Sequence, residues 1–403
     1  MEKVSAQDTQ IIHHPNHETP RTYLLDNRNA KNTNDVQPVQ IFCHQMPKCE
    51  FHAHLTGSIS RKMLHTLDLR HRSDYGIDLI QDELSRLHEY DRKPRNLVEA
   101  FELFPLIQQL VVEPEDVAEV TSEVIREFSE ENVVYLELRS TPRQTTRMSK
   151  EEYVKALITG VVQSRQLYSS ICVRLLLSID RRQTVEEASE TVKLALRYGK
   201  HNDDKAINGI IVGVEVSGDP KYDARKFLPL LREAKNDLPV ITFHLAEMEE
   251  YMDEVEECVF FGPTRIGHAT FLHKISDEAQ LNKISEYLCK NRIPIEICLS
   301  SNMVCGTVKS VEASHLAHYF EKKHPILIST DDRAMMCCSL SDEYEHVARA
   351  LNLDAQEIFN LSYSTTKYIC KNLTAGEKLL IFNQFHKFAK TQNLTLKYSK
   401  IQP

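Results

Sequence analysis

Eight short apolar segments recur along this chain, and each is followed by a longer segment with helical periodicity. Most of them are uninterrupted runs of Val, Ile and Leu, as in strands buried on both faces of a parallel sheet. Eight strand–helix units are the count of a (β/α)8 barrel. We therefore predict strands over Lys48–Leu55, Val133–Thr141, Val173–Ile179, Ile210–Val216, Val240–Leu245, Arg265–Gly267, Ile293–Leu299 and Ile326–Ser329.

The main alternative fold is an open, doubly wound α/β sheet. No G-x-G-x-x-G or G-x-x-x-x-G-K-[ST] motif follows the first strand, which favours the barrel. Residues 59–107 are predicted to be a helical insertion after the first strand, and the chain beyond residue 339 to form closing helices. Residues 1–45 are polar and lack periodicity, so we expect a flexible tail followed by one domain over residues 46–395.

Composition narrows the class of protein. The 403 residues carry a formal net charge of −9, which argues against binding to a nucleic-acid polymer. The sequence has no apolar run long enough for a membrane span and no apolar leader at its N-terminus. The ten cysteines form no C-x-x-C pair and are typical of reduced core residues. We expect a cytoplasmic protein that acts on small molecules.

Histidines and carboxylates follow the predicted strands at the end where a barrel enzyme keeps its catalytic groups. His52 and His54 lie two residues apart on the first strand, so both side chains point to the same side. Together with His244 and Asp331 they form a set that suits one catalytic Zn²⁺. The fourth strand ends without the lysine that usually bridges two ions, and the P-C-x-x-C motif of cytidine-type deaminases does not occur.

Several motifs resemble those of the adenosine/AMP deaminase family, and most closely its branch of N6-methyl-AMP deaminases. They are MPKCEFHAHLTGSIS, VVYLELRSTPR, VEVSGDP, FHLAE, RIGHATFL, IEICLSSN and STDD, in the family's order. The resemblance implies a barrel of the metal-dependent hydrolase type, with zinc held by His52, His54, His244 and Asp331. It further implies that Glu247 protonates purine N1 and that His268 orients and helps to deprotonate the attacking water.

The same resemblance implies a set of substrate contacts. Asp332 would contact purine N7, and the Gly218 backbone would contact the base near N3. Further contacts would come from His54, Thr56, Gln108, Asp180 and the segment Ser140, Thr141, Pro142 and Arg143. Hydroxyls, backbone N–H groups and a guanidinium can hold a phosphate dianion. The alternative for this segment is a surface turn in which Arg143 forms an ion pair.

Three positions depart from the family pattern, namely Thr56, Gln108 and Arg333. Arg333 follows Asp332 directly, so we expect it either to tighten phosphate binding or to distort the loop. Glu296 is expected to serve strand packing. The predicted activity is conversion of N6-methyl-AMP to IMP and methylamine by a monomeric enzyme. The alternatives are an adenosine deaminase acting on the nucleoside and a catalytically silent binding barrel.

Overall fold

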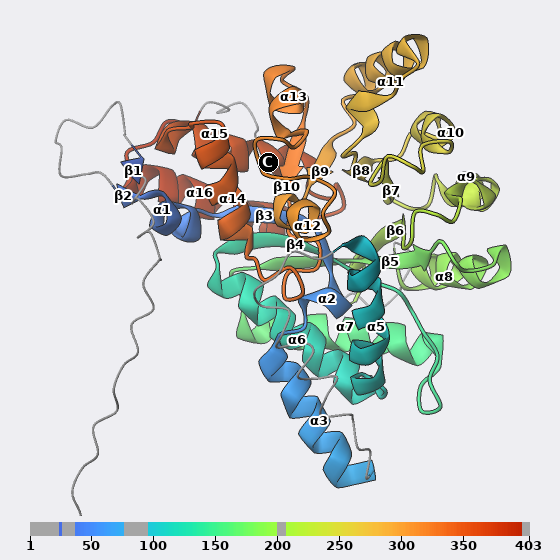
Figure 1. Ribbon diagram of the computed structural model, residues 1–403. Helices are drawn as coiled ribbons and strands as arrows, with labels where there is room; N and C mark the ends of the chain where they lie inside the picture. Colours follow the sequence, from blue (N-terminus) through green and yellow to red (C-terminus); the bar gives the residue numbers. More distant parts are fainter. Residues whose placement is uncertain (1–23, 26–36, 76–95, 200–206, 397–403) are drawn as a thin grey trace, which may run out of the picture.

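Eight parallel strands form a nearly closed barrel with helices around it (Figure 1). The structure is a computed structural model, and it describes residues 24–25, 37–75, 96–199 and 207–396. The strands pair in sequence order, which confirms the predicted (β/α)8 fold. They are β3 Lys48–His54, β4 Val133–Ser140, β5 Cys172–Asp180, β6 Ile211–Ser217, β7 Val240–Leu245, β8 Arg265–His268, β9 Ile295–Ile297 and β10 Ile326–Ile328. Nearly all of their residues are buried.

The barrel closes between its last and first strands, just beyond the end of β10. Asp331 forms an isolated parallel bridge with Ala53 of β3. The Asp331 N–H donates to the His52 carbonyl over 2.7 Å, and the His54 N–H donates to the Asp331 carbonyl over 3.0 Å. The backbone that closes the barrel therefore also fixes the positions of three predicted metal ligands.

The helices begin where capping residues predict. Ser149 caps α7 and Thr184 caps α8, each in a reciprocal pair with the Glu three residues later. Pro114 stands at the start of α6, as expected for a first helical position. The helices around the barrel are α6 Pro114–Glu130, α7 Lys150–Leu167, α8 Val185–Tyr198, α9 Leu228–Ala234, α10 Val255–Phe260, α11 Glu278–Asn291, α12 Leu299–Val304 and α13 Leu316–Glu321.

Additions to the barrel match the two predicted positions. The insertion after the first strand forms α2 Leu55–Ser58, α3 Arg61–Tyr75 and α5 Leu97–Leu110, with residues 76–95 outside the described residues. The closing helices are α14 Leu340–Ala350, α15 Ala355–Ser364 and α16 Ala375–Thr391. Among the helices that the structure describes, none combines the length and apolar character that a membrane span requires.

Most of the expected tail, residues 1–45, lies outside the described residues. Two short strands, β1 Leu24–Leu25 and β2 Gln37–Pro38, pair antiparallel, and α1 Val39–Gln45 follows. Val39, Phe42 and Cys43 of α1 are buried, and the helix packs against α14. The described residues of this segment thus include a helix with a buried apolar side, which the polar composition of residues 1–45 concealed.

Candidate active site

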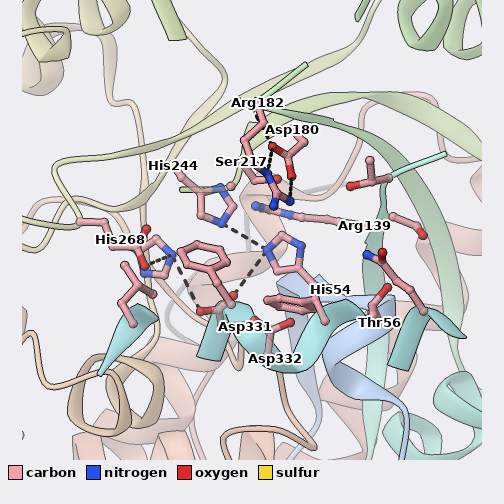
Figure 2. A pocket seen from close by; sticks show the side chains of 18 of the residues that line it. His54, Thr56, Arg139, Asp180, Arg182, Ser217, His244, His268, Asp331 and Asp332 are labelled. Carbon is pink, nitrogen blue, oxygen red and sulfur yellow. Dashed lines mark hydrogen bonds and ion pairs between the residues drawn. The ribbon is translucent and has the colours of Figure 1, made fainter. Parts of the chain in front are cut away.

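A cavity opens at the C-terminal ends of the strands, and residues from most of the barrel line it (Figure 2). The predicted residues that line it are His54, Thr56, Gln108, Ser140, Thr141, Arg143, Asp180, Gly218, His244, Glu247, His268, Asp331 and Asp332. His52 is fully buried beneath this surface. Pro142 is buried next to Thr141 and stands outside the lining.

Four predicted ligand atoms converge at the centre of the cavity floor. His54 Nε2 lies 3.3 Å from His52 Nε2 and 3.2 Å from His244 Nε2. Asp331 Oδ1 lies 3.4 Å from both His52 Nε2 and His54 Nε2. Four atoms that surround an ion tetrahedrally at about 2.0–2.1 Å would lie about 3.3–3.4 Å apart. Figure 2 shows His54, His244 and Asp331 pointing toward one another.

The chemistry of this cluster fits a cation. Imidazole nitrogens that approach within 3.3 Å cannot all be neutral acceptors without repulsion, and an ion between them removes the conflict. Although burial and Arg139 disfavour a charge on His52, hydrogen bonds to Asp331 and Glu296 raise its pKa to about 9. Burial lowers the pKa of His54 and His244, so these two rings favour the neutral form, whose free ring nitrogen can bind a cation. The Ser301 hydroxyl donates to Asp331 Oδ2 over 2.7 Å and holds the carboxylate in place.

Beneath the ligand cluster, buried charged side chains form a network of ion pairs inside the barrel. Glu296 Oε2 contacts His52 Nδ1 at 2.7 Å and accepts from Arg139 Nη2 at 2.5 Å, while its Oε1 accepts from Arg265 Nε at 2.6 Å. Arg139 also donates to Glu215 over 2.8 Å. Glu296, which was expected to serve strand packing, also contacts His52, one of the predicted metal ligands. Such partners fix the tautomer and the direction of an imidazole.

Glu215, Glu247 and His268 lie around the cluster of four ligand atoms. Glu215 Oε1 lies 3.4 Å from His54 Nδ1, the ring nitrogen that faces away from the cluster centre. His268 Nε2 lies 3.8 Å from Glu247 Oε1 and 3.9 Å from Asp331 Oδ2. His268 is thus placed between a buried acid and the ligand set.

Two carboxyl groups in the cavity favour the protonated form. Burial raises the pKa of Glu247, with nearby His268 opposing the shift. Burial, Asp331 and Glu247 together raise the pKa of Asp332 well above its usual range. A protonated carboxyl can donate a hydrogen bond or a proton to a ring nitrogen, which an ionised one cannot.

Several strands end in left-handed backbone at the cavity. Ala246, His268, Ala269 and Asp331 all have φ between 50° and 64°, and Gly218 has φ 98°. This region is costly for residues other than glycine. Each such residue changes the direction of the chain where it leaves the sheet.

The predicted phosphate segment follows β4 at the edge of the cavity. The Ser140 hydroxyl lies 2.7 Å from the Tyr153 hydroxyl. The Arg143 guanidinium donates to the Val111 carbonyl and lies 5.8 Å from the centre of the Tyr153 ring. Among the described residues, no carboxylate forms an ion pair with Arg143, so the turn-with-ion-pair alternative has no support. Arg143 instead keeps its positive charge at the cavity.

Residues that the sequence analysis did not select also line the cavity. They are Leu97, Phe101, Phe104, Arg139, Arg182, Ser217 and Met336. Arg182 reaches Asp180 through Nε at 2.9 Å and Nη2 at 2.6 Å. Arg333 takes neither expected role, because it pairs with Glu127 and Glu131. The run I-D-R-R gives no local sign that its second arginine, Arg182, faces a cavity. Phe101 and Phe104 belong to the insertion after the first strand, so their position could not be inferred from the strand ends.

A closed parallel barrel with an imidazole and carboxylate cluster at its C-terminal mouth defines a (β/α)8 enzyme whose site could hold a metal ion. The sequence model of the Adenosine deaminase family matches residues 47–379. The chain therefore belongs to the adenosine deaminase family.

Several relatives are similar over most of their length. The N6-methyl-AMP deaminase of Homo sapiens is 38% identical over 331 residues, which span 81% of this chain and 90% of the relative. The crystal structure of the Arabidopsis N6-mAMP deaminase superposes with a TM-score of 0.73 at 36% identity, covering 86% of this chain and 99% of that one. An Arabidopsis structure complexed with IMP gives 0.73 at 35% identity, covering 87% and 99%.

Proposed function

We propose that this protein is a zinc-dependent hydrolytic deaminase that converts N6-methyl-AMP to IMP and methylamine. Relatives that carry the name N6-methyl-AMP deaminase support this substrate, and one relative is described with IMP bound. The observation that carries the proposal is one cavity that contains both the ligand cluster and the Arg143 guanidinium. A purine nucleotide needs both groups, because its ring would react at the ligand cluster while its phosphate binds the guanidinium.

The ligand set would be His52, His54, His244 and Asp331, with one ion per chain. A bound Zn²⁺ supplies a water nucleophile at neutral pH, because it lowers the pKa of water to about 7. Three imidazole nitrogens and one carboxylate oxygen are donors that zinc accepts. Glu296 behind His52, at 2.7 Å, supports this assignment because carboxylate partners of this kind are typical of ligand histidines.

The acid and base roles follow from where the chain's own groups lie. Glu247 is buried and has a raised pKa, so it can hold the proton that purine N1 takes up. His268, between Glu247 and Asp331, would orient the water and accept its proton. Water adds at C6 and gives one proton to His268. As the C6–N6 bond breaks, His268 passes that proton to the leaving amine, and the C6 hydroxyl proton returns to Glu247. The proton on N1 stays with the product. Asp332, with a strongly raised pKa, can donate to N7.

Arg143, Ser140 and Thr141 would bind the 5′-phosphate. The Arg143 guanidinium is half-buried and its donor contact is to a carbonyl, which leaves its charge available to an anion. Thr56, Gln108, Asp180 and Gly218 would contact the rest of the nucleotide, since all four face the cavity. The ten free cysteines, eight of them buried, are typical of the reducing cytosol, and we include a cytoplasmic location in the proposal.

A turnover panel on purified protein tests the proposal, with zinc quantified in the same sample. N6-methyl-AMP should be converted with higher kcat/KM than adenosine or N6-methyladenosine, with one zinc per chain. An Arg143→Ala variant should lose roughly 10- to 100-fold in kcat/KM for the nucleotide and little for the nucleosides. Arg147→Ala is the matched control, because Arg147 lies on the same loop but pairs with Glu113 outside the cavity.

The outcomes separate the alternatives. If kcat/KM is equal for nucleotide and nucleoside, and Arg143→Ala changes neither value, the adenosine deaminase activity is favoured. Zinc-free protein without turnover, even after zinc is added, would favour the silent barrel.

A further inference from the structure

A second cavity lies at the opposite end of the barrel from the ligand cluster. Its walls include the first residues of two strands, Val240 of β7 and Arg265 of β8, and Pro294 just before β9. The short helix Thr365–Tyr368 and the residues after it form the remaining side. Its volume is about 430 Å³. This is within the range of small-molecule sites.

The charges around this cavity are all of one sign. Its five charged lining residues are Lys235, Arg265, Arg292, Lys367 and Lys371. Among the described residues that line it, none is Asp or Glu. The whole chain has 58 acidic residues against 49 basic ones, so an all-basic cavity departs from its general character. Positive clefts in acidic proteins focus the field that attracts anions.

Three of these cations, Lys235, Arg292 and Lys371, have no anionic partner among the described residues. Lys235 Nζ donates to the Phe261 carbonyl and lies over its ring, and Arg292 Nη1 donates to the Lys323 carbonyl over 3.3 Å. Neither partner carries a negative charge. Lys371 is exposed, and no described residue forms an ion pair with it.

Two further observations fit this picture. Burial and the neighbouring Arg232 lower the pKa of Lys235, as expected where no anion offsets the ammonium. Arg265, by contrast, is buried and pairs with Glu137 and Glu296 on the barrel axis. It closes the floor of the cavity, and the four other cations of the lining are exposed.

The geometry points to a binding site for a small polyphosphate anion, organic or inorganic, at the N-terminal end of the barrel. Lys235, Arg292 and Lys371 would contact the phosphates through charge-assisted hydrogen bonds. Tyr287 and three prolines in the lining offer apolar surface to an organic group such as a nucleoside. This site is separate from the deaminase cavity and does not depend on its substrate.

Titration calorimetry on the zinc-loaded protein at fixed ionic strength tests the site, with inorganic pyrophosphate, ADP and adenosine as probes. Pyrophosphate and ADP should bind saturably, and adenosine should not bind at this site. Lys235→Gln and Lys371→Gln should each weaken the pyrophosphate Kd roughly tenfold. Both side chains are exposed, and a thermal melt of each variant checks that folding is unchanged.

Two controls locate the binding. Lys387→Gln removes an exposed lysine of α16 outside the cavity lining and should leave the Kd unchanged. Arg143→Ala removes the predicted phosphate-binding cation of the deaminase cavity and should also leave pyrophosphate binding intact. Pyrophosphate binding that is lost in Arg143→Ala but unaffected in the two cavity variants would overturn the proposal. So would the absence of saturable pyrophosphate binding.

Discussion

Glu296 allows a quantitative test of how the barrel interior supports the predicted metal ligands. Its two oxygens serve three charged or polar partners, at 2.7 Å from His52 Nδ1, 2.5 Å from Arg139 and 2.6 Å from Arg265. In a Glu296→Gln variant one oxygen can still face His52 and Arg139. The amide NH₂ then faces the Arg265 Nε–H, so that a donor meets a donor.

The expected cost follows from these contacts. Breaking one partner of a buried ion pair typically costs about 3–5 kcal/mol, and Glu296 is completely buried. That is a large share of the roughly 5–15 kcal/mol by which a folded protein is stable. Loss of the carboxylate behind His52 should also weaken zinc binding on the order of 10- to 100-fold.

Urea unfolding at pH 7 and zinc competition against a chelator measure the two effects. Glu343→Gln is the matched control, because Glu343 is equally buried but burial raises its pKa to about 8. It is therefore largely neutral at pH 7, and an amide should replace it at a cost below about 1 kcal/mol. If Glu296→Gln lowers neither the unfolding free energy nor the zinc affinity beyond this control, the assigned role of Glu296 is refuted.

Three further predictions concern Glu343 and two glycines. The pKa of Glu343 is higher in the folded chain, at about 8, than the ordinary 4.5, so the folded state binds more protons between these values. Its contribution to the unfolding free energy should therefore fall as pH rises from 4.5 to 8. Urea titrations should show that the unfolding free energy of Glu343→Gln depends less on pH than that of the unchanged protein. An equal pH dependence would contradict this. A Cβ at Gly57 would lie 1.8 Å from Asp332 Oδ1, so Gly57→Ala should cut kcat/KM on the order of 100-fold while zinc content is retained. At Gly376, in the first turn of α16, a Cβ meets nothing within 4 Å, and Gly376→Ala should raise stability by up to about 1 kcal/mol without affecting turnover.

The strands were predictable because buried parallel strands carry a continuous apolar signal. Val240–Leu245 was predicted with its observed bounds, and the predicted start of Val133–Thr141 is that of β4. The predicted strand Ile293–Leu299 was too long, since β9 covers only Ile295–Ile297 and α12 begins at Leu299. Apolar character alone does not separate the end of a strand from the start of a buried helix.

The ligand cluster could be found from the sequence because its members follow strands at the same end of a barrel. The residues that support it could not. Arg139 and Glu296 look like ordinary charged residues in a strand, and only the closed barrel brings them together from positions 157 residues apart. Arg333 lies next to Asp332 in sequence, yet its side chain points away from the cavity and pairs with Glu127 of α6 and with Glu131. Sequence neighbours at a strand end can therefore face different environments.

The left-handed residues at the strand ends place backbone strain at the catalytic face. At a cost of about 1 kcal/mol each for non-glycine residues, Ala246, His268, Ala269 and Asp331 together hold several kcal/mol. The hydrophobic contacts of the remaining barrel have to compensate for this conformational cost. Variants selected only for heat resistance would tend to relax these turns, and activity would decline as the protein became harder to melt.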